Sequence, residues 1–242
     1  MSLISDFDQR TAWKRERITG WFGTNPNVLN KVDPEGRYRT FPGTTVVFQC
    51  SEPMFEVISP LQDELHFQLA GSEMLAQRLP SAAFHMTLHD LVSPEQKTAH
   101  SLPDYFHEMD DSLRCAVEIV SSLRGSYRGK HISMAADHIV NMVSKSIVML
   151  LKPVKEEDFE LLLEMYHQFD EIVRLPYPLT PHITLAYFKP CMIDGDKLGN
   201  VVVSLNEKLK SLPVFEFSIE NLTAQRFLDM QTYIDFPISH SL

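Results

Sequence analysis

A four-residue pattern of histidine, an apolar residue, threonine and leucine occurs twice in this chain and limits how it can fold. The first copy lies in "FHMTLHDL" (84–91) and the second in "PHITLAYF" (181–188). Both copies lie in short apolar runs typical of β-strands, where successive side chains point to opposite faces. Each copy therefore places its histidine and threonine on one face and its apolar residues on the other. The fold must bury two apolar faces while it presents two polar ones.

The segments before the two copies follow the same order. A strand predicted at 44–50 and a helix predicted at 51–71 precede the first copy, and a strand at 144–154 and a helix at 155–173 precede the second. Pro60 is expected to break or kink the first of these helices. The order indicates an α+β fold with two similar strand-helix halves, each ending in one copy of the motif.

Further elements fill the rest of the chain. A helix is predicted over about 106–123 and another near 196–211, with strands at 131–142, within 214–227 and at 232–238. Residues 1–43 are predicted to be an irregular lead-in, rich in Gly, Pro, Asn and charge, that packs on the domain through aromatic residues such as Trp13 and Trp21. Residues 44–242 are predicted to form a single bilobal domain.

Composition excludes several classes of protein. The 242 residues are 44% hydrophobic and 22% charged, which is ordinary for a globular chain. No stretch approaches the roughly 18 to 20 apolar residues of a membrane helix, and the first 17 residues mix acids, bases and polar groups where a signal peptide has an apolar segment. We therefore expect a cytoplasmic protein without a membrane partner.

Cysteine content and charge narrow the choice further. Cys50, Cys115 and Cys191 are odd in number and widely spaced, which disfavours a disulfide framework or a structural zinc site and indicates reduced core thiols. The formal net charge of −10 disfavours a long track for a nucleic-acid backbone. A small anionic ligand remains compatible with it, because a local pocket can be positive on an acidic protein.

The repeated motif has the groups that phosphodiester chemistry needs. If the two strands lay side by side in the middle of a sheet, two imidazoles and two hydroxyls would converge on one cleft. One neutral histidine then takes a proton from water while the other, protonated, donates to the leaving oxygen. The threonine hydroxyls donate to the non-bridging phosphate oxygens. A single such motif is usually structural, but two copies in matching contexts indicate function.

The motifs "HMTL" and "HITL", about a hundred residues apart in a chain of two strand-helix halves, resemble the signature of the 2H phosphoesterase superfamily. The resemblance implies a bilobal α+β fold with antiparallel-rich sheets facing a central groove, and metal-independent action on 2′,3′-cyclic phosphates or related phosphodiesters. It implies His85 and His182 as the acid and base, with His182 favoured as the base. It implies that Thr87 and Thr184 hold the phosphate.

Other polar and aromatic residues give weaker signals. Tyr187 is a candidate for stacking on a base. The turn "RGSYRGKH" concentrates Arg124, Arg128 and Lys130 on an acidic protein, where they are candidates for steering an anion, although such a run is more often a solvated loop. His89 follows His85 by four residues, and on a regular strand it would share the face of His85 at about 13 Å. A zinc site using both is therefore disfavoured.

These features predict a metal-independent phosphodiesterase with no cofactor, acting on 2′,3′-cyclic phosphates of nucleotides or short RNA ends. One alternative is a non-catalytic module that binds a phosphate or nucleotide. Others are an RNA-end ligase-like activity and a metal-dependent hydrolase, although the paired Asp or Glu residues that such metal sites recruit are lacking near the histidines.

Overall fold

The computed structural model describes residues 18–96 and 101–236, and most of its strands form two antiparallel sheets. The first sheet has the order β10-β9-β2-β3 and the second the order β6-β5-β4-β8. The first consists of β2 (Gly43–Gln49), β3 (His85–Asp90), β9 (Leu222–Phe227) and β10 (Tyr233–Asp235). The second consists of β4 (His131–Met142), β5 (Ser146–Pro153), β6 (His182–Tyr187) and β8 (Phe215–Ser218). The predicted α+β class with antiparallel-rich sheets is confirmed.

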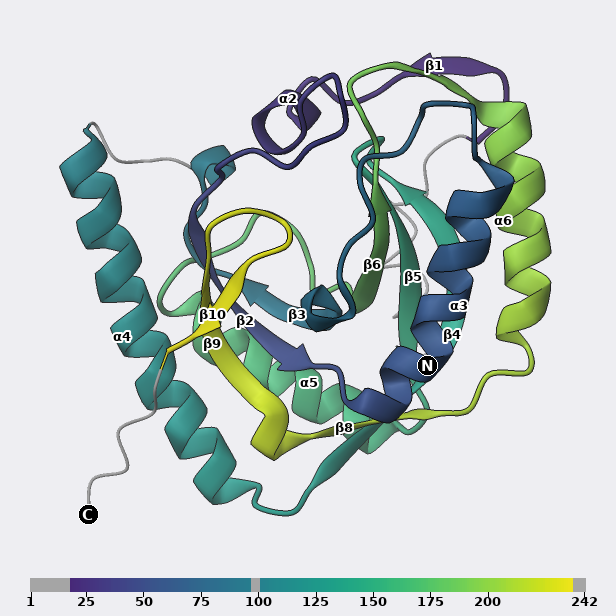
Figure 1. The fold of residues 1–242 in the computed structure, drawn as a ribbon. Coiled ribbons are helices and arrows are strands. Elements are labelled where there is room, and N and C mark those ends of the chain that lie inside the picture. The colour runs from purple at the N-terminus through teal and green to yellow at the C-terminus, as the bar shows by residue number, and fades with distance from the viewer. Residues whose placement is uncertain (1–17, 97–100, 237–242) are drawn as a thin grey trace.

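The two motif strands, β3 and β6, are the terminal strands of these sheets and contact each other in the middle of the molecule (Figure 1). They do not lie side by side in the middle of one sheet, which was the condition considered for convergence of the motif side chains. Among the described residues each has a hydrogen-bonded partner strand on one side only, β2 or β5, and the sheets meet along these terminal strands. The motif residues are therefore placed at the junction of the two lobes, each of which is built on one of these sheets.

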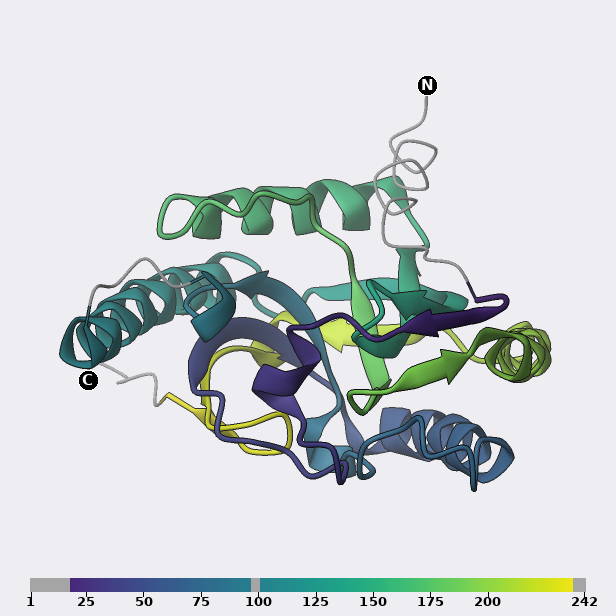
Figure 2. The same ribbon diagram turned by 90° about the horizontal axis from the view of Figure 1, so that it is seen from above.

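Helices cover the outer faces of the sheets (Figures 1 and 2). The long helix α4 (Leu102–Ser126) packs on β2 and β9 of the first sheet, whereas α6 (Gly195–Leu209) packs on β4 of the second. The helices of the two strand-helix-strand units cross between lobes. α3 (Glu52–Gln68) lies between β2 and β3 in sequence but packs on β6, and α5 (Glu156–Asp170) contacts β3 as well as β5. Each motif strand is thus supported by the helix of the other half.

Helix α3 continues through Pro60, contrary to the predicted break. Proline has no N–H to donate to the carbonyl four residues earlier, which normally weakens a helix. Here Pro60 and Glu56 are both exposed, so water can reach that carbonyl. Met54, Ile58 and Leu65 on the opposite face are buried in the core, and their burial holds the helix together across the proline.

The predicted lead-in contains regular structure that the sequence pattern did not indicate. β1 (Trp21–Gly23) pairs with β7 (Met192–Asp194), and the short helix α2 (Val28–Lys31) follows it. Trp21 itself is exposed, so its expected packing role was wrong. Residues 1–17, with Trp13, lie outside the described residues, and the division at residue 43 stays a prediction.

Two other expectations can be compared with the structure. The three cysteines are free thiols, but only Cys50 is buried, while Cys115 on α4 is exposed and Cys191 is intermediate. The expectation of three core thiols was therefore wrong for Cys115. Among the described residues, no helix has the length and apolar character that crossing a membrane requires.

Candidate active site

Both motif strands carry a β-bulge one residue after the threonine. On β3, Thr87 pairs with Val47 and His89 pairs with Val46, the residue next to Val47 on β2. Leu88 is therefore an extra residue of β3 with no partner of its own on β2. The same irregularity occurs on β6 opposite Ile147 and Val148. A bulge breaks the strict alternation of faces, and the two strands consequently share one burial pattern, in which the first, third and sixth residues are half-buried and the others buried.

The bulges bring a third residue of each strand to the polar face. On β3 this face carries His85, Thr87 and Asp90, and on β6 it carries His182, Thr184 and Tyr187, all lining one cavity of about 400 Å³. Asp90 and Tyr187 therefore occupy matching positions in the two halves. Simple alternation had placed His89, not Asp90, on this face, and that expectation was wrong.

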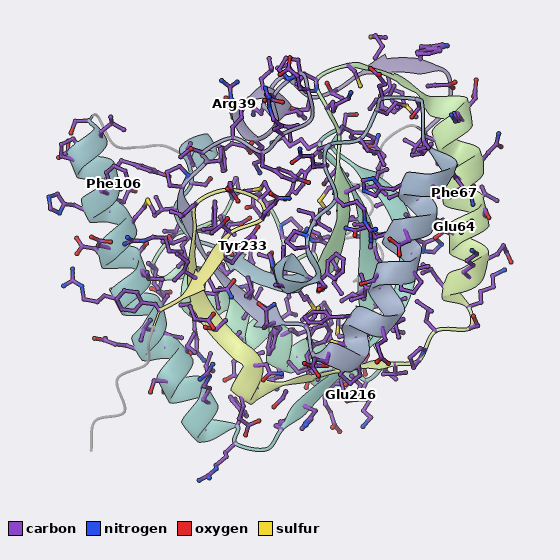
Figure 3. All side chains as sticks on the ribbon, in the orientation of Figure 1. Arg39, Glu64, Phe67, Phe106, Glu216 and Tyr233 are labelled. Carbon is purple, nitrogen blue, oxygen red and sulfur yellow. The ribbon has the colours of Figure 1, made fainter. Side chains whose placement is uncertain are left out.

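The four motif side chains line this one cavity, and residues from distant segments complete it. Tyr233, which Figure 3 labels on β10, contributes its ring, and its centroid lies 4.7 Å from that of His85 in an edge-on arrangement. The remaining lining includes Asn25, Lys31, Thr45, Glu95, Lys145 and Tyr177. Tyr187 also lines the cavity, with its ring 5.9 Å from that of Tyr38.

The two imidazoles have different environments. His182 Nδ1 lies 2.7 Å from the carbonyl oxygen of Thr180. Since a carbonyl only accepts, Nδ1 carries the proton in neutral His182, and any proton transfer by this ring is through Nε2. His85 Nδ1 is buried near the Ala83 carbonyl, but it makes no hydrogen bond of regular geometry to a described residue. Burial lowers the pKa of His85 to about 4, and the opposing effects of the Asp90 carboxylate and the Ala83 carbonyl are smaller.

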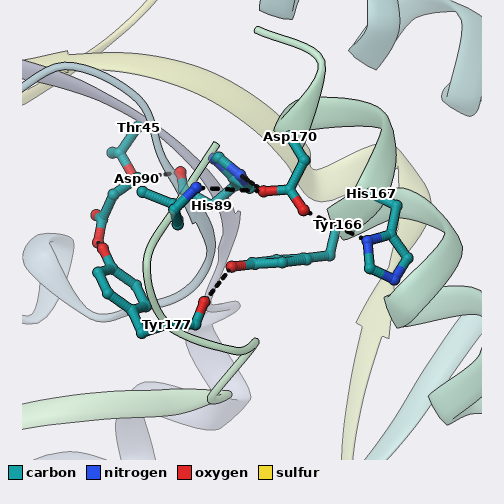
Figure 4. Close-up of polar contacts among 8 residues, drawn as sticks. Thr45, His89, Asp90, Tyr166, His167, Asp170 and Tyr177 are labelled. Atoms are coloured by element: carbon teal, nitrogen blue, oxygen red, sulfur yellow. Dashed lines mark hydrogen bonds and ion pairs between the residues drawn. The ribbon is translucent and has the colours of Figure 1, made fainter. Parts of the chain in front are cut away.

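His89 lies behind the first sheet, where it packs against helix α5. Its Nε2 is 3.1 Å from Asp170 Oδ1, and its ring centroid is 4.9 Å from that of Tyr166 (Figure 4). Burial lowers the pKa of His89. His85 and His89 therefore face opposite sides of β3 and cannot hold one metal ion together.

Polar contacts fix Asp90 on the cavity side of the bulge (Figure 4). Tyr177 Oη donates to Asp90 Oδ2 at 2.7 Å, and the backbone carbonyl of Tyr177 accepts a 2.6 Å hydrogen bond from Tyr166 Oη. On the other flank, Thr45 Oγ1 donates to the carbonyl of His89 at 3.1 Å. The Pro-rich segment before β6 thus holds the end of β3, so the two halves of the site depend on each other.

Two lysines from distant parts of the sequence reach the cavity rim. Lys145 Nζ donates to Glu95 Oε2 at 2.7 Å, and Lys31 Nζ lies 3.8 Å from Glu95 Oε1. The three side chains are only 18 to 19% exposed. Lys31 is the last residue of α2, Glu95 lies in the short 3₁₀ helix η3 (Pro94–Gln96), and Lys145 directly precedes β5. They are the cationic residues among those that line the cavity.

The basic turn predicted to steer an anion does not line this cavity. Arg124 lies at the end of α4, and its Nε donates to the carbonyl of Leu222 at 2.9 Å, while Arg128 and Lys130 are exposed nearby. Their role in steering an anion stays a prediction, but local charge density in the sequence did not indicate the two lysines that line the cavity. Lys31, Lys145, Tyr177 and Tyr233 carry no local signal and come together only by folding.

Comparison with known proteins found one matching family model and several similar solved structures. Residues 31–143, which include the first motif, match the family model described as "2H-phosphodiest: Domain of unknown function (DUF1868)". No curated protein matches the chain. The crystal structure of a conserved protein of unknown function, ATU0111 from Agrobacterium tumefaciens, is similar at 17% identity and a TM-score of 0.65, covering 96% of this chain and 97% of that one. This similarity shows a shared fold.

Two more distant structures were also found. E. coli LigT in apo form has 14% identity and a TM-score of 0.44, covering 82% of this chain and 96% of that one. Kluyveromyces marxianus Usb1 with uridine monophosphate has 9% identity and a TM-score of 0.47, covering 84% and 99%.

Proposed function

Because this chain is a 2H phosphoesterase, an enzyme that hydrolyses phosphodiesters, we propose that its substrate is a 2′,3′-cyclic phosphate on a nucleotide or a short RNA end. The observation that carries the proposal is the convergence of His85 and His182, from the terminal strands of two sheets, on one cavity of about 400 Å³. Each histidine has a threonine two residues later on the same face. A cavity of this size suits a mononucleotide or the last residue of an RNA rather than a folded nucleic acid.

Hydrolysis of the cyclic ester requires one proton to be removed and one supplied. The oxygen of water attacks phosphorus as a histidine takes its proton, and the bond from phosphorus to the 2′ or 3′ oxygen breaks as the other histidine protonates that oxygen. The products are a phosphate monoester and a ribose hydroxyl. The reaction needs one imidazole neutral and the other protonated.

The environments of the two histidines support His85 as the base. With its pKa lowered to about 4, His85 is neutral at pH 7 in the ligand-free protein and is therefore ready to accept a proton. His182 then supplies the proton to the leaving oxygen from Nε2, with Nδ1 held by the Thr180 carbonyl. This assignment is the reverse of the one favoured by the family resemblance.

The threonines and Tyr187 complete the proposed roles. Thr87 and Thr184 donate to the non-bridging oxygens, where negative charge develops in the transition state. Burial raises the pKa of the Tyr187 hydroxyl, and a hydrogen bond with Thr184 opposes this rise only in part. Tyr187 therefore stays neutral at physiological pH. Its ring contributes an aromatic surface for the nucleobase, and its hydroxyl orients Thr184.

The proposal is tested by incubating the protein with adenosine 2′,3′-cyclic phosphate and separating the products. We expect a monophosphate to accumulate, and His85→Ala or His182→Ala to lower kcat at least about 10²-fold, since each general acid or base step contributes this much or more. His107→Ala, at an exposed position on α4, is the matched control and should keep full activity.

Two results would overturn the proposal. Full activity in either active-site variant, with the fold verified by circular dichroism, would remove the two-histidine mechanism. Saturable binding of the cyclic nucleotide without any product would instead identify a binding module.

A further inference from the structure

The proposed two-histidine reaction uses neither of the two lysines at the cavity rim. We propose that Lys31 and Lys145 form a second anion subsite, which binds a further phosphate group of the same substrate. This proposal rests on the proposed function and names its substrate class more closely. The substrate would be a nucleotide phosphodiester that carries a second phosphate, either on its own 5′ oxygen or as the backbone phosphate of a preceding nucleotide.

The charges of the cluster favour an anion. Lys31, Glu95 and Lys145 sum to +1, on a chain whose formal net charge is −10. One carboxylate lies between two ammonium groups, and each of these has three hydrogens to donate. Lys145 Nζ makes a 2.7 Å hydrogen bond to Glu95, but the 3.8 Å separation from Lys31 Nζ is too long for one. Lys31 therefore keeps donor capacity directed at the cavity rim.

Aromatic rings hold the Lys31 ammonium in this position. Its Nζ lies 4.8 Å from the ring centroid of Phe41 and 5.9 Å from that of Tyr187. A cation over an aromatic face is stabilised there even when it is partly removed from water. Tyr187 lies on motif strand β6, so the ammonium is held beside the predicted catalytic face.

Lys145 is presented by a strained turn. The two residues before it, Val143 and Ser144, both have positive φ, 47° and 52°. This conformation is unfavourable for a β-branched residue such as valine, and strained backbone persists only where its surroundings impose it. Here Asn25 holds the turn, since its backbone N donates to the Ser144 carbonyl at 3.0 Å and its Nδ2 to the Val143 carbonyl at 3.3 Å. The segment before β2 thus fixes Lys145, which precedes β5, at the cavity rim.

The experiment compares ligands with one and two phosphates by calorimetry, without any need for turnover. The probes are adenosine 3′-monophosphate, adenosine 3′,5′-bisphosphate and a 3′-phosphorylated adenosine dinucleotide. We expect the wild type to bind at least one of the two doubly phosphorylated probes about tenfold or more tightly than the monophosphate, because a charge-assisted hydrogen bond contributes about that factor. The probe that gains identifies the source of the second phosphate.

The ratio of the affinity for the doubly phosphorylated probe to that for the monophosphate, here called the advantage, should fall towards one in Lys31→Met and in Lys145→Met. Lys189→Met is the matched control. The Lys189 side chain is 14% exposed and its Nζ lies 3.7 Å from Glu73 Oε2, but it does not line the cavity. It should keep the full advantage. In wild-type protein the advantage should also decrease between 50 and 500 mM salt, a measurement that needs no variant.

Equal binding of all three probes by the wild type would overturn the subsite, as would an advantage unchanged by both lysine variants or by salt. These outcomes are distinct from failure of the proposed function. If the protein bound the bisphosphate through these lysines but hydrolysed no cyclic phosphate, the subsite would stand and the assigned reaction would fall.

Discussion

Protonation of His85 should destabilise the folded protein in mild acid. Its pKa is about 4 in the folded state and 6.5 in an unfolded chain, so the folded state binds fewer protons between these values. The stability that the folded protein has with neutral His85 is fully present above pH 6.5. It is lost progressively as the pH falls towards 4, because the unfolded chain takes up the proton more readily. At pH 4.5 the loss amounts to about 2 kcal/mol.

The assay is urea unfolding at pH 7.5 and pH 4.5, followed by circular dichroism. Other titrating groups affect wild type and variants alike, so the quantity of interest is the difference between proteins. His85→Gln, which cannot take up the proton, should lose about 2 kcal/mol less than the wild type between the two pH values. The exposed variant His107→Gln should behave like the wild type.

An NMR titration of the His85 ring protons measures the pKa of His85 in the folded protein directly and is independent of the unfolding experiment. A midpoint near 6.5, or an equal loss of stability in wild type and His85→Gln, would refute the reasoning. It would also remove the support for His85 as the base.

Three further predictions concern the site and its frame. Thr87→Ala and Thr184→Ala should each lower kcat by about 10²-fold while Thr→Ser costs less, because serine keeps the donor; equal losses for Ala and Ser would indicate packing instead. Dialysis against EDTA should leave turnover unchanged, and the two-histidine mechanism fails if activity disappears and one added metal restores it. Gly43→Ala should lower the free energy of unfolding by about 1 to 3 kcal/mol in urea titrations, since the added Cβ would clash with the Phe227 ring and lie 2.6 Å from the Val92 carbonyl oxygen; a stability equal to wild type would show that the backbone yields there without cost.

The motif residues were predictable because the motif itself encodes their common face. His85 and Thr87 are two residues apart, and so are His182 and Thr184, which suffices on any strand. Asp90 was not predictable in this way. Its orientation follows from the bulge, and the bulge depends on the pairing of β3 with Val46 and Val47, far away in the sequence.

The secondary structure followed the sequence pattern closely where apolar periodicity was strong. β4 coincides with the predicted strand at 131–142, and α5 lies within the predicted helix. The C-terminal strands show the limit of such reasoning. One apolar run, 214–227, contributes β8 to the second sheet and β9 to the first, and no periodicity within that run indicates the change of sheet.

The cavity rim shows the same limit for function. Lys31 and Lys145 are single lysines that belong to no motif in the sequence. Only the tertiary structure brings both to Glu95. The cluster at Arg124 and Arg128 looked more basic in sequence, but it lies outside the cavity. Which charges face a ligand is a property of tertiary structure.

The place of β9 has a consequence for the synthesis of this protein. β9 pairs with β2 along most of that strand, yet it follows β2 only after most of the chain has been made. Until then the segment "TTVVFQ" of β2 has one edge of unpaired N–H and C=O groups, and it combines β-branched residues with no charge and no proline. Such a segment pairs readily with copies of itself. Nascent or C-terminally shortened chains should therefore aggregate through β2 and depend on chaperones until β9 occupies that edge.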